Sequence, residues 1–401
     1  MKLLRILLLL SLFGAASLAF AQPGVVVECV NTLDIERIDE VVSLPARGFA
    51  KETIRFLDGA TVVPHQVVNG RILLVLSFGP RETKRLTVDE SGIPAFPKRT
   101  QADLAVKVDY QLVGGVYTGG RYQRVLSARI PPGHFPHDAY FKYEGPGWES
   151  DLVGYRLYLD ERNRCDIFGK RARGVVLHTV GVNDLVSDGK ESYQQMQEWG
   201  QDIFKVGASL GIGSFALWHG GRPIPVAVID SGICRVTEDG PVYSEVSLDY
   251  YGWKAGGRSR TLNAKLSIAA GSRLTHVTLA GRPAGARFCT GLARHDGCTL
   301  LRSPARTGWG YIATYGKQAL TGDNLGIALF YRVADCVRRT EDSLSQILVL
   351  QPRGGRVEYA FAAAWEQEPN GIRDAEAFRR YLDSTARSLG APIRAVVRKL
   401  K

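Results

Sequence analysis

The chain lacks the features that would mark it as a membrane, nucleotide-binding or repeat protein. Beyond the N-terminal segment, no uncharged stretch approaches the roughly 20 residues that a membrane-spanning helix needs. The glycines at 207–213 do not follow GxGxxG, and no strand–glycine–helix context supports a nucleotide site. Repeats and low-complexity tracts are also absent. With 45% hydrophobic and 23% charged residues, the 401-residue chain is not a disordered one.

What the chain has in excess is glycine and arginine. Its 44 glycines favour a turn-rich β protein over a helical bundle, and its length allows two or three domains, or one large sandwich with a small companion. The 37 arginines and 14 lysines give a formal net charge of +11. Nucleic acids and uronate-bearing or sulfated polysaccharides are all anionic partners that suit such a surface. A merely arginine-biased composition is the rival explanation.

The N-terminus predicts export. Lys2 and Arg5 precede an uncharged stretch that ends in Ala19-Phe20-Ala21, which is the pattern of a cleaved secretory signal peptide. Cleavage near Ala21 would make the protein secreted or periplasmic and lower its charge from +11 to +9. Export argues against DNA or RNA as the natural partner, so we predict no nucleic-acid partner and no membrane span. The sequence leaves the oligomeric state open.

None of the six cysteines belongs to a CxxC pair. Cys289 and Cys298 flank an Asp296-Gly297 turn signal, so a disulfide across a hairpin is favoured over a zinc site that would add His295. The other four are expected to be free buried thiols.

Short β-like runs separated by turn dipeptides predict a mainly β fold in two parts. After the signal peptide at 1–21, residues 22–100 predict a small β-sandwich domain that ends in a Gly/Pro-rich linker at 91–99. Residues 101–401 predict a large antiparallel β-sandwich domain that carries the active site. Two helices are expected. One is at Met196–Val206, where apolar residues recur at spacings of 3, 4 and 3, and the other is at Asp374–Arg387.

Two segments concentrate polar and aromatic residues. In 131–170, His134 and His137 lie in a turn-rich stretch, followed by acidic and aromatic residues and by Arg156 and Lys170. In 193–213, Tyr193 and a run through Lys205 precede a series of small residues. A solvated loop would equally explain the first segment, and core packing would explain the second.

Both segments resemble a family of secreted bacterial proteins with a domain of unknown function. The resemblance is carried by Trp148–Asp151, Tyr155-Arg156, Asp166–Lys170 and Tyr193–Gly211, and it continues through Gly240–Trp253 and Ala364–Glu366. It implies a galactose-mutarotase-like sandwich and a role in the breakdown of uronate-rich glycans, because at least one similar protein is an oligosaccharide dehydratase. Ser150 and Gln194 stand where similar proteins carry Asn and His, so a catalytic role of that histidine would leave this chain altered or inactive.

The resemblance therefore implies a carbon–oxygen lyase that acts on uronate-containing oligosaccharides by β-elimination, either as a lyase or as a dehydratase. Such a reaction needs positive charge on the carboxylate, a base at C5 and an acid at the C4 oxygen. We assign these roles to the following residues: Arg156, Lys170 and Lys205 as neutralisers, His137 or His134 as the base, Tyr155 or Tyr193 as the acid or proton relay, Trp148 and Trp199 as sugar-binding aromatics, and Glu149 as an orienting carboxylate.

Each assignment has a rival. Arg156 and Lys170 are nearly as well explained as structural partners of Glu149 and Asp166. We expect no cofactor, although a divalent cation at His134, His137 and Asp138 stays open. A glycoside hydrolase would need two flanking carboxylates. A mutarotase-like enzyme and a non-catalytic anionic-glycan-binding protein are two further classes that the sequence leaves open.

Overall fold

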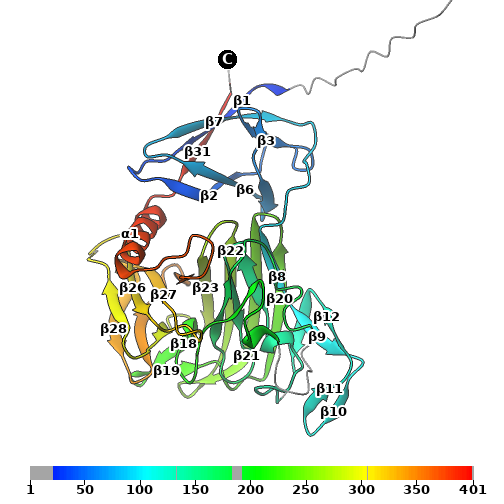
Figure 1. Cartoon of the computed structure of the whole chain (residues 1–401), viewed down its shortest axis with the longest axis vertical. Coiled ribbons are helices and arrows are strands. Elements are labelled where there is room, and N and C mark those ends of the chain that lie inside the picture. The colour runs from blue at the N-terminus through cyan, green and yellow to red at the C-terminus, as the bar shows by residue number, and fades with distance from the viewer. Residues whose placement is uncertain (1–20, 132, 183–191, 305, 400–401) are drawn as a thin grey trace, which may run out of the picture.

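The computed structural model describes residues 21–131, 133–182, 192–304 and 306–399. The predicted signal peptide lies outside these residues, except for Ala21. Within them the chain is mainly β, as predicted, and its antiparallel sheets pack face to face in sandwich-like layers (Figure 1). No helix in this part of the chain is long and apolar enough to cross a membrane.

Two small antiparallel sheets make up the N-terminal part (Figure 1). The first has the order β31-β1-β7-β3-β4, with bounds β1 (Ala21–Val30), β3 (Arg55–Asp58), β4 (Thr61–Val62), β7 (Thr83–Asp89) and β31 (Arg394–Lys399). The second has the order β2-β6-β5, with bounds β2 (Arg37–Pro45), β5 (His65–Val68) and β6 (Arg71–Phe78). Apolar residues of both sheets, including Val27, Leu74 and Leu86, are fully buried in one shared core.

The first small sheet contains residues from both ends of the chain. β31 pairs with β1 along six positions, from Val25 opposite Lys399 to Val30 opposite Arg394. Ile393, which immediately precedes β31, is buried in the N-terminal core. The sequence pattern did not indicate this pairing, because nothing local to a strand says which distant strand lies beside it. The predicted domain boundary near residue 100 stays a prediction.

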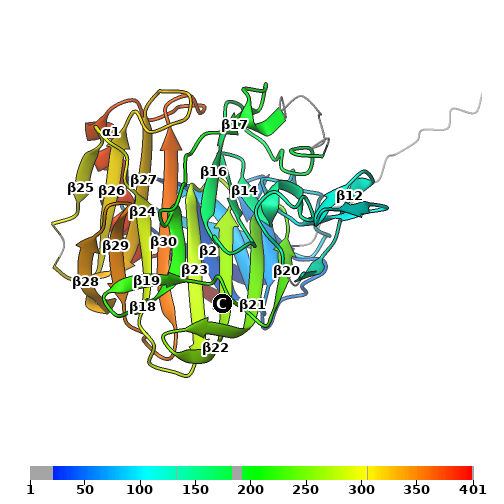
Figure 2. The same ribbon diagram turned by 90° about the horizontal axis from the view of Figure 1, so that it is seen from below.

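A nine-stranded antiparallel sheet forms the centre of the molecule, and its strands follow one another across Figure 2. In spatial order its strands are β13 (Ser127–Ile130), β20 (Ser231–Asp239), β21 (Tyr243–Ala255), β22 (Arg258–Ala269), β23 (Leu274–Arg282), β30 (Val357–Trp365), β27 (Leu325–Arg332), β26 (Trp309–Gly316) and β25 (Thr299–Arg302).

Two further five-stranded sheets share a core with the nine-stranded sheet. One, which we call the β14–β17 sheet, runs β17 (Gly200–Asp202), β16 (Cys165–Lys170), β15 (Val153–Leu157), β14 (Gly147–Ser150) and β8 (Thr100–Asp103). The other runs β19 (Arg222–Pro225), β18 (Ile212–His219), β24 (Phe288–Ala293), β29 (Ser345–Leu350) and β28 (Cys336–Glu341). One large apolar cluster joins all three sheets.

Smaller elements complete the fold. Two pairs of short strands lie at one side of the molecule (Figure 1), namely β9 (Ala105–Val108) with β12 (Arg121–Arg124) and β10 (Gln111–Val113) with β11 (Val116–Thr118). The 3₁₀ turns are η1 (Lys142–Glu144), η2 (Ser192–Gln194) and η3 (Val333–Asp335).

The predicted C-terminal helix is confirmed as α1 (Ala375–Gly390). Asp374 caps it by accepting a hydrogen bond from the Ala377 amide at 2.7 Å, which satisfies a donor that the first turn leaves unpaired. Phe378 and Leu382 are fully buried on one face, in a cluster with Ala328 and Phe330 of β27. The helix is therefore docked on the nine-stranded sheet.

Two local expectations are wrong. Met196–Val206 is not a helix, because this segment forms β17 and pairs with β16. Cys289 and Cys298 are both free. β24 pairs with β18 and β29, and the strand after Cys298 pairs with β26 in the nine-stranded sheet, so the Asp296-Gly297 turn carries the chain between two sheets rather than closing a hairpin.

Candidate functional site

The predicted site residues of 148–170 lie on the β14–β17 sheet, and the alternation of its strands divides them between two faces. Trp148, Tyr155 and Ile167 point into the shared core. Their neighbours Glu149, Arg156 and Lys170 lie on the opposite, outer face. The segments around 142–146, 171–182 and 192–199 cover this outer face, where Tyr143, Leu177 and Tyr193 form an apolar cluster with Phe168 of β16.

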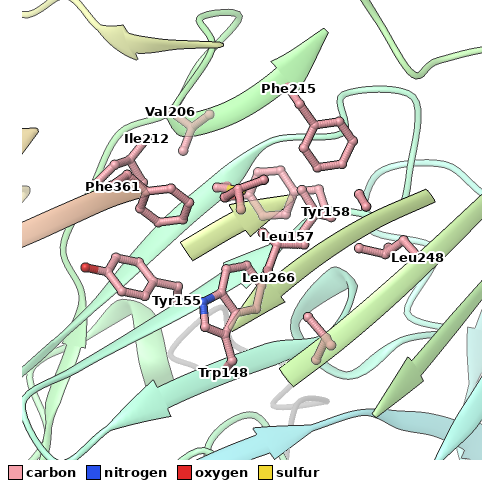
Figure 3. Close-up of a cluster of buried hydrophobic side chains, with 14 of the residues drawn as sticks. Trp148, Tyr155, Leu157, Tyr158, Val206, Ile212, Phe215, Leu248, Leu266 and Phe361 are labelled. Carbon is pink, nitrogen blue, oxygen red and sulfur yellow. The ribbon is translucent and has the colours of Figure 1, made fainter. Parts of the chain in front are cut away.

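The core-facing residues are fully buried and satisfied by partners inside the protein. Trp148 Nε1 donates to Thr275 Oγ1 at 2.8 Å. The Tyr155 hydroxyl donates to the Arg273 carbonyl at 2.7 Å and accepts from the Ala363 amide at 2.8 Å. Figure 3 shows both rings inside the apolar cluster. This placement argues against Trp148 as a sugar-stacking residue and against Tyr155 as an acid, because no substrate atom can reach either ring.

Lys170 and Glu149 form a fully buried ion pair on the outer face. Lys170 Nζ also donates to the carbonyls of Ser150 at 2.6 Å and Gly174 at 2.7 Å. Glu149 Oε1 accepts from the amides of Val176 and Leu177, each at 2.8 Å. Burial lowers the pKa of Lys170 and raises that of Glu149, against their mutual attraction. The pair thus anchors the covering segment, which is a structural role for Lys170.

Arg156 is the centre of a second buried cluster. Its Nη2 donates to Asp166 Oδ2 at 2.7 Å and to Asp202 Oδ2 at 2.6 Å, and the Tyr158 hydroxyl lies 3.1 Å away. Its Nη1 is buried, lies 3.9 Å from Glu144 Oε2 and has no hydrogen-bond partner among the described residues. We call these five residues the Arg156 network.

Asp202 is the member of this network that the sequence reasoning missed as a chemical group. Burial, followed by the negative charge of Asp166, raises its pKa to about 8, and the opposing charge of Arg156 does not cancel that effect. The raised pKa favours the protonated form of Asp202 at neutral pH. It lies between Trp199 and Lys205 in the second segment, so its position was visible, but its proximity to Arg156 depends on the pairing of β17 with β16.

Two aromatic residues from the second segment cover the Arg156 network. The guanidinium carbon of Arg156 lies 5.2 Å from the centre of the Tyr193 ring, and Phe168 contacts the same ring edge-on at 5.8 Å. Trp199 is half-buried against Phe168, with ring centres 6.0 Å apart. The structure thus brings Tyr193 to Arg156, whereas Trp199 is connected to Arg156 through Phe168. Gln194, where similar proteins carry His, is exposed in η2.

The two candidate histidines lie in different surroundings. His137 has a 77% exposed side chain, and its Nδ1 lies 3.2 Å from Glu144 Oε1, which joins it to the Arg156 network. The side chain of His134 is buried, with Nδ1 2.6 Å from Asp138 Oδ2. His134 lines a separate cavity of about 210 Å³ that also includes Asp160. Of the two, His137 is the imidazole attached to the network.

Lys205 is not part of this arrangement. Lys205 is exposed. The pKa of nearby His295 is lowered first by the burial of His295 and second by the positive charge of Lys205. Among the described residues no group of three or more His, Cys, Asp or Glu side chains is arranged to hold a metal ion. At the suggested cation site His134 contacts Asp138, whereas His137 turns to Glu144.

The arrangement unites three kinds of chemical group. Arg156 offers a buried cation, Asp202 offers a proton at neutral pH, and His137 offers an exposed imidazole linked to both through Glu144 and Arg156. A carboxyl group whose pKa is raised by its surroundings is suited to an acid role. Glu149, by contrast, is committed to a buried pair with Lys170, and Asp151 is paired with the more exposed Arg99 and Arg173.

Comparison with known proteins identifies the family. Residues 29–395 match the family described as "Domain of unknown function (DUF4861)", so the chain belongs to this family. No curated relative matches the chain.

Two solved structures from Enterococcus faecalis are similar in shape. An α-mannosidase from strain V583 has 8% sequence identity and a TM-score of 0.46, with 95% of this chain and 47% of that chain covered. A protein in glycosyl hydrolase family 38 has 8% identity and a TM-score of 0.45, with 94% and 48% covered. The chain spans about half the length of these two proteins.

Proposed function

We propose that this protein is an exported carbohydrate-active enzyme that acts on uronate-containing oligosaccharides by β-elimination. The observation that carries the proposal is the Arg156 network, in which a buried guanidinium, a carboxyl group that holds its proton and an exposed imidazole lie in one chain of contacts. The family resemblance of 148–170 and 193–211 supports the choice of uronates, and so does the positive net charge.

In the proposed reaction Arg156 stabilises the substrate carboxylate as it gains charge. Its Nη1 has no hydrogen bond among the described residues but is buried, so the substrate carboxylate reaches it only when the segments that cover the outer face move aside. His137 removes the proton from C5, and the C5–H electron pair becomes the C4–C5 double bond. The C4–O bond breaks, and Asp202 or Tyr193 gives a proton to the departing oxygen. The leaving group is a sugar for a lyase and water for a dehydratase.

A glycoside hydrolase is the second candidate, because of one specific observation. Asp166 and Asp202 both contact the same nitrogen of Arg156, and Asp202 has a pKa raised to about 8. Sugar hydrolysis requires a carboxylic acid that holds its proton and a second carboxyl group that flanks the same glycosidic bond, and Asp202 and Asp166 are the candidates for these two roles. Products separate the two reactions, since elimination creates an unsaturated uronide and hydrolysis does not.

To test this proposal, the mature protein is incubated with uronate oligosaccharides while the ultraviolet absorbance and the concentration of reducing ends are measured. We expect absorbance to rise, and we expect His137→Ala to lower the rate by about 10²–10⁴-fold, as for loss of a general base. His219→Ala, which changes an exposed histidine outside the network, is the matched control. Full activity of His137→Ala would reject His137 as the base, and reducing ends without absorbance would replace elimination by hydrolysis.

A further inference from the structure

A further cavity lies outside the Arg156 network, although Leu152 and Arg173 of its wall are close to Arg156 and Asp166 in sequence. It has a volume of about 560 Å³ and is enclosed by β2, by the start of β23, by the loop after β30 and by α1. In Figure 1 α1 lies between the N-terminal sheets and the nine-stranded sheet, at the position where these parts meet. We call this space the junction cavity. None of the five residues of the Arg156 network lines it.

Among the uncharged polar side chains that line the junction cavity, three come from three different elements. They are His276 of β23, Asn370 of the loop before α1, and Ser384 of α1. No hydrogen bond from any of these side chains to another described residue is present, so their donors and acceptors are open to a molecule in the cavity. His276 faces it because its neighbours Thr275 and Val277 point into the core.

His276 combines exposure to the cavity with a deep position in the molecule. Its side chain is accessible to solvent, yet burial lowers the pKa of its imidazole. The ring is therefore neutral at pH 7 and presents one donor and one acceptor nitrogen. A neutral imidazole is suited to hydroxyl groups, which also donate and accept.

The cationic side chains of the cavity wall are already paired. Arg273 contacts Glu368 at 2.7 Å, Arg37 contacts Glu40 at 2.9 Å, and Arg173 contacts Asp151 at 3.2 Å. An anion such as phosphate or sulfate would have to compete with these carboxylates for each arginine. The wall thus favours an uncharged polar ligand over an anionic one.

We propose that the junction cavity binds a neutral sugar unit, held by hydrogen bonds from its hydroxyl groups to His276, Asn370 and Ser384. The volume is within the range of about 300–1,000 Å³ typical of small-molecule sites. The proposal goes beyond the elimination reaction and does not depend on it, because the two sites share none of these residues. In a glycan that mixes uronates with neutral sugars, the cavity would give the enzyme a second point of attachment.

The test measures binding of neutral disaccharides to the full mature protein by calorimetry, with cellobiose, lactose, xylobiose and mannobiose as probes and with sodium sulfate and sodium glucuronate as anionic comparators. We expect at least one disaccharide to bind at millimolar concentration and the anions not to compete. His276→Ala is expected to weaken that binding about tenfold, the loss of roughly one hydrogen bond. His219→Ala is the matched control and should bind as the unmodified protein does.

A second variant tests the proposal if His276→Ala does not fold properly. Ser384→Phe places a bulky ring in the cavity from α1 and is expected to abolish binding while the helix and the circular-dichroism spectrum are retained. The proposal is overturned if no disaccharide of the panel binds, if sulfate or glucuronate binds in its place, or if both variants bind as tightly as the unmodified protein. Because these neutral disaccharides have no C5 carboxylate to support elimination, either result is independent of the proposed reaction.

Discussion

At the scale of single residues, the protein places several charged groups where water cannot reach them and pairs them with one another. Arg156 and Lys170 are both nearly or completely buried, and each meets a carboxylate. Breaking a buried pair leaves a charge without compensation, which costs far more than losing a pair at the surface. Arg156 is therefore both a stabilising residue and the proposed site of substrate binding.

Arg156→Met should destabilise the protein by about 3–5 kcal/mol, because Asp166 would stay buried without its cation. Urea denaturation of the unmodified protein and the variant measures the change. Arg85→Met is the matched control, since the 75% exposed Arg85 side chain makes a surface contact with Glu28 and its loss should cost about 1 kcal/mol or less. Equal effects of the two substitutions would show that the Arg156 network contributes little to stability.

The raised pKa of Asp202 predicts that the stability of the folded protein depends on pH. Its folded-state pKa of about 8 is above the roughly 3.9 of an unfolded aspartate, so the folded protein holds a proton that the unfolded chain releases. Its contribution to stability is therefore full below about pH 4 and is lost as the pH rises to about 8. Subtracting the curve of Asp202→Asn from that of the unmodified protein isolates this contribution from that of Glu368, whose pKa burial also raises, to about 7. A difference that is flat between pH 4 and 8 would contradict the raised pKa.

At the scale of elements, the sequence predicted strands well and their partners poorly. The alternation in 105–110 and 154–159 identified β9 and β15, and the absence of Gly and Pro in 374–387 identified α1. Met196, Trp199, Ile203 and Val206 have helical spacing, which suggested a helix. In the structure they do not share one packing face. Trp199 packs on the outer face, whereas Ile203 and Val206 enter the core.

At Gly200 the pairing of β17 with β16 determines the local structure, and the helical spacing of the apolar residues does not. This residue has a φ of +134° and lies against Gly169 of β16, where any Cβ atom would collide with the Gly169 carbonyl. As with the strands, the sequence indicated single residues of the candidate site but not which of them lie together. The sequence named Arg156, Tyr193 and His137 as candidates. The proximity of Arg156 to Asp202 and the burial of Trp148 and Tyr155 depend on sheet register, which the spacing of residues within one strand does not reveal.

The pairing of β31 with β1 predicts that the extreme C-terminus stabilises the N-terminal sheets. Deleting residues 393–401 removes the edge strand and the buried Ile393, and it exposes the backbone donors and acceptors of β1. We expect the shortened chain to unfold at a lower urea concentration and to aggregate more readily. Deleting only 400–401 is the matched control, and identical denaturation curves for all three proteins would contradict a structural role of β31.

At the scale of the whole molecule, the positive net charge and the Arg156 network agree with the proposed uronate substrate. After loss of the predicted signal peptide the formal charge is +9, and such a surface attracts anionic glycans over distances that salt shortens. We expect KM for a uronate oligosaccharide to rise with ionic strength. Binding of a neutral disaccharide to the junction cavity should not change with salt. A salt-independent KM would contradict attraction by the whole surface.

The most direct test of the proposed function is the ultraviolet absorbance of an unsaturated uronide during incubation of the mature protein with uronate oligosaccharides, compared with His137→Ala and His219→Ala. The account predicts a steady rise for the unmodified protein and for His219→Ala, and a rate about 10²–10⁴-fold lower for His137→Ala. Reducing ends that appear without any change in absorbance would contradict it.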